Sequence, residues 1–246
     1  MLLRRLARIV RGQLNRRLKL DVVSLFQVNT LRSHLAELIN SYRIDTVVDV
    51  GANEGQFGGL LRDLGFGGDI HSFEPVKAIY DRLSRLAIDD VRWTTHNVAL
   101  GDKSGKATIN VSEHSVLSSL LVPSDYGSRL YDNIKIVRQE EIEITTFDEF
   151  HDGCLKGQGR RIMLKMDTQG YDLQVLAGAE RSLAEIHCMM SELSLLPIYQ
   201  GMTHYLEALA AYEKKGFAVS GIYPIDRNSD MSLIEADCLL VNRARF

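Results

Sequence analysis

The sequence has little cysteine and no long apolar run. Its 246 residues include three cysteines, Cys154, Cys188 and Cys238, and no two of them form a CxxC pair. This pattern excludes a disulfide framework and a zinc ribbon, and it fits a reducing compartment such as the cytoplasm. No apolar stretch approaches the roughly 18 residues that a membrane-spanning helix needs. We therefore expect a protein without spanning helices.

The chain also lacks a large excess of either charge. It has 29 lysines and arginines against 32 aspartates and glutamates, and this net charge of −3 gives no reason to expect nucleic-acid binding. Apolar residues make up 45% and charged residues 25%, which is typical of a soluble globular protein and excludes disorder. Because no repeat or linker interrupts the chain, residues 21–246 are expected to form a single domain.

The charge is nevertheless unevenly distributed. Residues 1–20 hold six arginines, one lysine and no acid, a net charge of +7 that leaves −10 for residues 21–246. At helical periodicity the apolar and basic residues separate onto opposite sides, which predicts a basic amphipathic helix. Such a helix either lies on an anionic membrane surface, at the inner face of a membrane, or docks on its own domain. A transit peptide is the weaker alternative, because no serine precedes Ser24.

Short apolar runs alternate with amphipathic stretches along most of the chain. Strands are expected at residues 46–50, 69–73, 91–95, 162–166, 186–192, 217–222 and 236–241. Helices are expected at residues 30–42, 54–64, 75–87, 171–184 and 203–215. This alternation predicts a doubly wound α/β fold with a mostly parallel sheet covered by helices.

Residues 105–145 have a different pattern. Apolar and polar residues alternate at 108–111, 134–137 and 141–144, which predicts half-exposed strands. The intervening residues 112–133 are rich in serine, aspartate, tyrosine and glycine, so a long functional loop is expected there.

The strongest local motif follows the first expected strand. Glycines stand at positions 51, 55 and 58, a G-x-x-x-G-x-x-G spacing that differs from the G-x-G-x-x-G of dinucleotide-binding loops. The spacing therefore argues against a nicotinamide-dependent oxidoreductase, the first alternative. Asp49 before the loop and Asn53 within it suit the ammonium and carboxylate of a zwitterionic ligand. Tight turns without a ligand are the less favoured explanation of Gly51 and Gly55.

Glu74 ends the second expected strand, 25 residues after Asp49. An acid at this point of an α/β fold accepts hydrogen bonds from the two hydroxyls of a ribose. It also suits the start of the helix that begins at Pro75, because the helix dipole favours an acid there. The two roles are compatible, and ribose binding is the preferred interpretation.

Taken in order, these motifs resemble the FkbM family of S-adenosylmethionine-dependent methyltransferases. The resemblance covers about residues 42–242, and residues 1–20 lie outside it. One departure is Gln169, where many members have glutamate. The matching segments are Asp49–Gly55, Ser72–Pro75, Asn97–Asp102 with Gly105, Leu164–Asp172 with Val175–Gly178, and Glu192–Ser194 with Pro197–Tyr199.

The resemblance implies a class I methyltransferase fold, Rossmann-like, with a seven-stranded sheet whose last strand is antiparallel. It implies that Gly51, Asn53 and Gly55 hold the methionine portion of S-adenosylmethionine and that Glu74 holds the ribose. Residues 97–100, which include Asn97, Val98 and Ala99, would line the adenine. Such enzymes methylate hydroxyl groups, often on sugars or natural products.

Methylation of an alcohol benefits from a base that accepts the hydroxyl proton, because an alcohol is a weak acid. Asp167 and Glu192 end the fourth and fifth strands of the main sheet, at the edge where α/β sheets bind ligands. His204, at a helix start, is the third candidate, and His114 and Asp237 rank below it. Each could also have a purely structural role.

Two further sets of residues are interpreted more cautiously. Asp167, Glu192 and Asp237 together would suit Mg²⁺, but their spacing matches no metal motif and no metal is predicted. Lys165 either pairs with an acid across the sheet or contacts the substrate. Ser118, Ser119 and Tyr126 would contact sugar hydroxyls if residues 112–133 close over the site.

The sequence thus predicts an S-adenosylmethionine-dependent O-methyltransferase acting on a glycan, a glycolipid or a secondary metabolite. The basic segment 1–20 favours a membrane-associated acceptor. A nucleic-acid methyltransferase is disfavoured because residues 21–246 are acidic and no aromatic stacking platform is evident. A non-catalytic scaffold anchored by its N-terminus is the remaining alternative.

Overall fold

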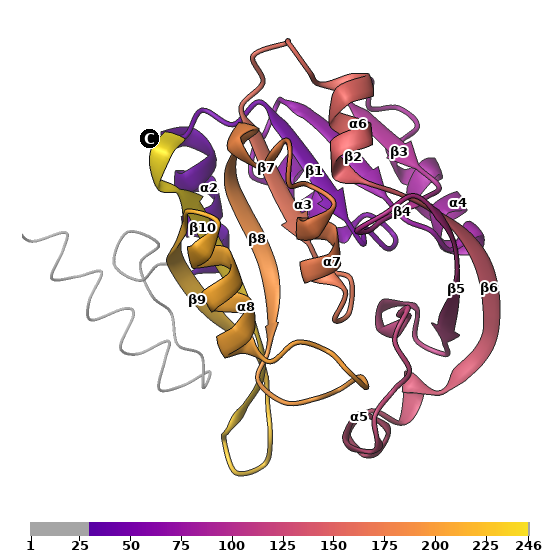
Figure 1. Cartoon of the computed structure of the whole chain (residues 1–246). Coiled ribbons are helices and arrows are strands. Elements are labelled where there is room, and N and C mark those ends of the chain that lie inside the picture. Colours follow the sequence, from indigo (N-terminus) through magenta and orange to yellow (C-terminus); the bar gives the residue numbers. More distant parts are fainter. Residues whose placement is uncertain (1–29, 246) are drawn as a thin grey trace, which may run out of the picture.

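A seven-stranded sheet with the strand order β3-β2-β1-β7-β8-β10-β9 forms the centre of the molecule. The computed structural model describes residues 30–245, so the predicted basic helix at residues 1–20 lies outside the described part (Figure 1). The strands of this sheet are β1 (Thr46–Val50), β2 (Asp69–Phe73), β3 (Trp93–His96), β7 (Ile162–Met166), β8 (Ile186–Ser194), β9 (Phe217–Arg227) and β10 (Leu233–Asn242).

Most neighbours in this sheet are parallel. Strand β1 pairs in parallel with β2 and β7, β2 with β3, and β7 with β8. Strand β10 lies between β8 and β9 and is antiparallel to both. The predicted fold class is therefore confirmed, including the seven strands and the antiparallel last strand. The carboxyl ends of β1, β2, β7 and β8 share one edge of the sheet, where α/β folds bind their ligands.

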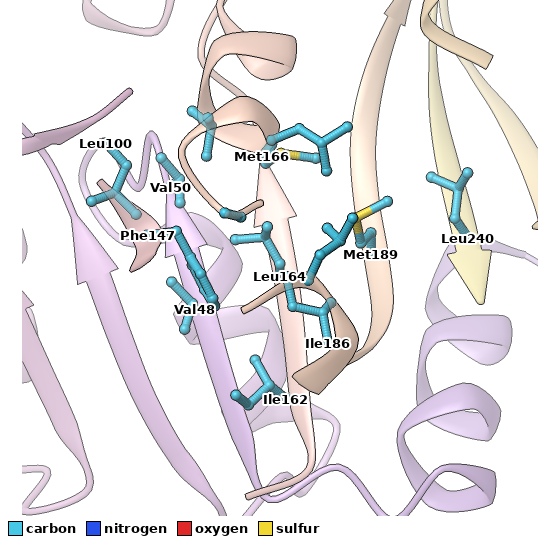
Figure 2. Close-up of a cluster of buried hydrophobic side chains, with 14 of the residues drawn as sticks. Val48, Val50, Leu100, Phe147, Ile162, Leu164, Met166, Ile186, Met189 and Leu240 are labelled. Atoms are coloured by element: carbon cyan, nitrogen blue, oxygen red, sulfur yellow. The ribbon is translucent and has the colours of Figure 1, made fainter. Parts of the chain in front are cut away.

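Helices cover both faces of the sheet because its strands are apolar on both sides. One face packs against α2 (Leu31–Ser41), α3 (Gln56–Asp63) and α4 (Lys77–Ala87). The other packs against α6 (Phe147–Cys154), α7 (Asp172–Ala177) and α8 (Tyr205–Lys214). Figure 2 shows the centre of this second layer, where Val48, Leu164 and Met189 of three neighbouring strands lie close to Phe147 of α6.

The central strands β1 and β7 show why both faces of the sheet are covered, because all five residues of each strand are buried. A strand between two parallel neighbours has no solvent-facing side, so its residues are mostly apolar. The two charged residues in these strands, Asp49 and Lys165, pair with each other. Helix α2 begins at a capping box in which Thr30 and Ser33 bond each other's backbone amides, and it buries Leu35, Leu38 and Ile39. These local signals account for the correct prediction of most element positions.

A second, three-stranded sheet with the order β4-β6-β5 stands beyond the carboxyl ends of the main strands (Figure 1). Its strands are β4 (Ala99–Leu100), β5 (Gly105–Ser112) and β6 (Ile136–Thr145). The two strands predicted at 134–137 and 141–144 form a single strand, because β6 runs without a break from Ile136 to Thr145, and residues 134 and 135 precede it. The expected long loop at 112–133 is broken by α5 (Asp125–Leu130) and by short 3₁₀ turns at Ser115–Leu117 and Asp132–Ile134.

Two helix predictions also differ from the structure. The helix expected at 171–184 ends at Ala177, because the chain turns sharply at Gly178. A Cβ at Gly178 would lie 1.9 Å from the carbonyl oxygen of Gly101, so only glycine allows this approach. Helix α6 was not predicted at all, because eight residues are few for a helical period to be recognised. Further 3₁₀ turns occur at Leu183–Glu185 and Arg243–Arg245.

None of the helices in residues 30–245 is both long enough and apolar enough to cross a bilayer.

Candidate active site

A cavity of about 650 Å³ lies at the carboxyl ends of β1, β2, β7 and β8. Ligand pockets in proteins commonly measure ~300–1,000 Å³. Residues 114–120, between β5 and α5, line one side of it, and side chains of β10 line the opposite side. The three-stranded sheet contributes Ile109 of β5 and Ile142 of β6. The cavity therefore combines the ligand-binding edge of the main sheet with the segment that connects β5 to β6 of the second sheet.

The β1–α3 loop enters the cavity with two residues in the left-handed backbone region. Gly51 has φ +72°, and a Cβ there would lie 1.9 Å from the Asp167 carbonyl oxygen, so glycine lets the loop pass against the end of β7. Asn53, with φ 47°, also lines the cavity. Its side-chain oxygen accepts a hydrogen bond from the Ser115 hydroxyl at 3.3 Å. Gly55 begins α3 and packs against Trp93, outside the cavity.

Glu74 closes one end of the cavity with a carboxylate that is 5% exposed. Its two oxygens accept hydrogen bonds from the backbone amides of Asn53 at 3.1 Å and Val76 at 2.8 Å. Burial raises the pKa of Glu74 to about 7, although the two amides and the charge of Lys165 act in the opposite direction. The sequence-predicted ribose contact thus faces the cavity and is held in a fixed orientation.

Asp49 does not reach the cavity, which differs from the predicted direct contact with a ligand. It is fully buried, and its Oδ1 lies 2.9 Å from the Nζ of Lys165. The Ser72 hydroxyl donates to its other oxygen at 3.1 Å. The Lys165 ammonium also donates to the carbonyl of Gly51 at 3.1 Å, so the Asp49–Lys165 pair holds the β1–α3 loop in position. Lys165 therefore pairs with an acid across the sheet, one of the two roles expected for it.

The charge state of Lys165 follows from the same contacts. Burial lowers its pKa, but the carboxylates of Asp49 and Asp167 outweigh burial and raise the pKa above its ordinary value. Lys165 is thus a permanent cation with no proton to exchange near neutral pH.

The third predicted cofactor segment has one residue in the cavity wall. Ala99 lines the cavity, whereas Asn97 and Val98 do not. The side-chain amide of Asn97 donates to the carbonyls of Glu74 at 3.0 Å and Pro75 at 2.9 Å, so it supports the turn that carries Glu74. Val98 packs against the apolar core.

Asp167 and Glu192, the two preferred base candidates, are brought together in the cavity wall. The side-chain amide of Gln169 lies between them and donates to Asp167 Oδ1 at 3.1 Å and to Glu192 Oε2 at 3.0 Å. The hydroxyl of Tyr199 lies 3.1 Å from Gln169 Oε1 and 2.8 Å from the Leu117 carbonyl oxygen. An amide donor at position 169 thus bridges two carboxylates.

Sequence reasoning noted Gln169 only as a departure from the resembled family and assigned it no contact. The signal that would have found it is an amide residue two positions after a strand-end acid. Its backbone is also constrained, with φ 53°, and its carbonyl accepts a hydrogen bond from Ser119 at 2.8 Å. Ser118 and Ser119 both line the cavity, as expected for the segment after β5.

Two acids of β10 complete this wall. Asp237 pairs directly opposite Glu192 in the antiparallel ladder, so the two side chains lie on the same face of the sheet. Glu235, two residues earlier, lies on that face too and was not predicted. Burial and nearby carboxylates, Asp167 above all, raise the pKa of Asp237 to about 6 and that of Glu235 to about 7. Burial and the same cluster raise the pKa of Glu192 well above its ordinary value.

The remaining candidate site residues differ in whether they line the cavity. His204 is exposed at the start of α8 and does not line the cavity. His114 lines it. The Tyr126 hydroxyl donates to Asn228 at 2.8 Å and takes no part in the cavity wall. Among residues 30–245, no group of three or more histidine, cysteine or acidic side chains is placed to bind a metal ion.

Residues 49–219 match the sequence profile described as "Methyltransferase FkbM domain". This match spans more than half of the chain. The protein belongs to the FkbM methyltransferase family. Its cofactor is S-adenosylmethionine, from which the family takes the transferred methyl group, and the nicotinamide alternative is therefore excluded. A comparison with curated proteins found no match.

Among solved structures, the chain is similar to fibrillarin from Aeropyrum pernix with bound S-adenosylmethionine (11% identity, TM-score 0.47, 80% of this chain and 66% of that one). It is also similar to magnesium protoporphyrin IX methyltransferase from Synechocystis (10% identity, TM-score 0.44, 95% of both chains). An rRNA methylase from Streptococcus thermophilus gives 9% identity and a TM-score of 0.46, over 88% of this chain and 98% of that one. Because these identities and TM-scores are low, the family assignment rests on the sequence-profile match alone.

The residues of the cavity fit S-adenosylmethionine by their chemistry. Glu74 presents a buried, amide-held carboxylate, a suitable acceptor for the two hydroxyls of a ribose. At the other end, the carboxylates of Asp167 and Glu192 face a cavity that would receive a cationic methyl donor. The family thus supplies the reaction class, and the chain supplies a cavity lined by carboxylates.

Proposed function

We propose that this FkbM-family protein is an O-methyltransferase that acts on a hydroxyl of a glycan, a glycolipid or a secondary metabolite. The observation that carries the proposal is the Asp167–Gln169–Glu192 bridge, which presents two carboxylates to the cavity beside the predicted cofactor loop. S-adenosylmethionine supplies an electrophilic methyl group on a sulfonium. The protein must then orient a hydroxyl and accept its proton.

Glu192 is the proposed base. Its raised pKa makes it a stronger proton acceptor than an ordinary carboxylate, and a base is most effective when its pKa approaches the working pH. Gln169 fixes its orientation through the 3.0 Å hydrogen bond, and Asp167 on the other side of the bridge positions the acceptor. Bound S-adenosylmethionine would supply the methyl group and leave as S-adenosylhomocysteine when its S–CH3 bond breaks, while a Glu192 carboxylate oxygen would accept the proton of the attacking hydroxyl.

Glu74, Gly51, Asn53 and Ala99 are the residues proposed to hold the cofactor, because all four line the cavity. Asp49, Gly55, Asn97 and Val98 are assigned supporting positions behind that wall. Holding two reactants in an aligned geometry contributes up to ~7–11 kcal/mol to catalysis, so orientation is the larger task of this site. Proton removal adds ~10²–10⁴-fold.

The first experiment is a calorimetric titration of the full chain with S-adenosylmethionine, followed by turnover with a panel of neutral, acidic and amino sugars. Release of S-adenosylhomocysteine reports turnover, and mass spectrometry locates the methyl group. Glu192→Gln should lower kcat by ~10²–10⁴-fold with cofactor affinity unchanged. Glu207→Gln is the matched control, because Glu207 is exposed on α8.

Other results of these experiments would favour a different function or a different base. A methyl group on carbon or nitrogen would contradict O-methylation. Tight cofactor binding without turnover on any acceptor would support the scaffold alternative. His204→Gln tests the third predicted base, and full activity is expected because the structure places this side chain outside the cavity.

A further inference from the structure

One wall of the cavity carries an excess of acidic side chains. We define the acid wall as the four carboxylates that β7, β8 and β10 present to the cavity: Asp167, Glu192, Glu235 and Asp237. The acid wall combines the end of β7 with a cross-strand pair, because Glu192 and Asp237 are direct partners in the β8–β10 ladder. Like charges in directly opposite positions destabilise a sheet. Without a compensating partner this arrangement is costly.

The described protein supplies little compensating charge. Lys165 is the one lysine or arginine among the described residues that line the cavity. Its ammonium lies 2.9 Å from Asp49 and donates to the Gly51 carbonyl, and it reaches only Asp167 of the acid wall, at 3.5 Å. The cation therefore balances Asp49, and the acids of β8 and β10 remain without a cation.

Glu235 is the clearest sign of a ligand-binding site. The residue is 6% exposed and lines the cavity, and its Oε1 has no hydrogen-bond partner within the described structure. A buried carboxylate oxygen without a partner is rare, because its desolvation is not repaid. Gln169 satisfies Asp167 and Glu192 but does not extend to Glu235. Glu235 is thus a buried acceptor that faces the cavity unused.

We propose that the acid wall binds a protonated amine of the methyl acceptor, so that the acceptor is an amino sugar or a related amino alcohol. The proposal rests on the O-methyltransferase function above and narrows its substrate class. An ammonium group offers three N–H donors, which suits Glu235 together with Asp237. Charge-assisted hydrogen bonds of this kind are the stronger ones in proteins.

The proposal also explains why oxygen would be methylated in an acceptor that contains nitrogen. An amine held as ammonium has no lone pair to attack the methyl group. The hydroxyl retains its lone pairs, and Glu192 accepts its proton. The raised pKa values of Glu235 and Asp237 agree with a site for a cation, since a bound ammonium would lower both.

The test measures binding of four monosaccharides to the full chain saturated with S-adenosylhomocysteine. D-glucosamine, N-acetyl-D-glucosamine, D-glucose and D-glucuronic acid share a ring and differ in charge. We expect D-glucosamine to bind at least about tenfold more tightly than the other three. Glu235→Gln should remove this preference, and Asp237→Asn should weaken it, while Glu207→Gln leaves it unchanged. Thermal unfolding of each variant confirms that it is folded.

Three results would overturn the proposal. The first is equal or tighter binding of the neutral or acidic sugars, and the second is no binding of D-glucosamine at millimolar concentration. The third is a changed ratio of S-adenosylmethionine to S-adenosylhomocysteine affinity in Glu235→Gln, which would show that Glu235 balances the sulfonium. Failure of the wild-type chain to bind either cofactor form would instead refute the proposed function itself.

Discussion

Replacing Lys165 with methionine should destabilise the protein strongly, because it leaves the buried Asp49 carboxylate without its cation. The two charged atoms are 2.9 Å apart and the side chains are 5% and 0% exposed. At an effective dielectric constant of ~20, their attraction is about 6 kcal/mol before the cost of desolvation. Removing one partner of such a pair typically costs ~3–5 kcal/mol. We expect a loss in this range in urea unfolding of Lys165→Met.

A double-mutant cycle separates the ion pair from simple packing. Asp49→Asn removes the orphaned charge, so the double variant should be at least about 2 kcal/mol more stable than the sum of the two single losses. Lys156→Met is the matched control. Lys156 lies 2.8 Å from Asp152, but their side chains are 66% and 34% exposed, and an exposed pair contributes under ~1 kcal/mol. A loss below about 1 kcal/mol for Lys165→Met, or strict additivity in the cycle, would refute this reasoning.

Three further predictions concern the cavity. The pKa of Glu74 is raised from its ordinary 4.5 to about 7, so ionising this carboxyl lowers the stability of the fold as pH rises between these values. The ionised form is the better acceptor for ribose hydroxyls, so calorimetry should show cofactor affinity increasing through pH 7. Glu74→Gln should bind the cofactor about 10–100-fold more weakly, with an affinity independent of pH. Gly51→Ala should lose about 3 kcal/mol or more in urea unfolding, because its Cβ would meet a carbonyl at 1.9 Å, whereas Gly59→Ala, with open space around it, should be neutral or stabilising. Gln169→Glu should move the acid limb of the kcat–pH profile upward, because a third carboxylate raises the pKa of Glu192; an unmoved limb would contradict the bridging role.

The local pattern of the sequence determined most of the fold. A strand buried on both faces, such as residues 46–50, is recognisable because it is rich in β-branched residues and ends at a glycine. The alternation of such runs with amphipathic helices led to the doubly wound sheet, and both features depend only on residues close together in the chain. Helix α6 was missed because eight residues are few for a helical period to be recognised from the sequence.

Site residues that directly follow the end of a strand could be predicted from the sequence. Gly51, Asn53 and Glu74 follow the ends of β1 and β2, and parallel strands bring their carboxyl ends to one edge. Asp167 and Glu192 were found for the same reason. The direct ligand contact predicted for Asp49 differs from the structure, because alternation along β1 turns that side chain toward Lys165.

The acid wall was decided only by the tertiary structure. Glu235 and Asp237 lie more than forty residues from Glu192 in the sequence, and they meet it because β10 inserts antiparallel between β8 and β9. Likewise, the Gln169 bridge depends on where two strand ends fall relative to one amide. Sequence periodicity fixes which residues form a strand and which side they face. The neighbours of a strand are set by packing between distant segments, so the charge of this cavity emerges only in the folded chain.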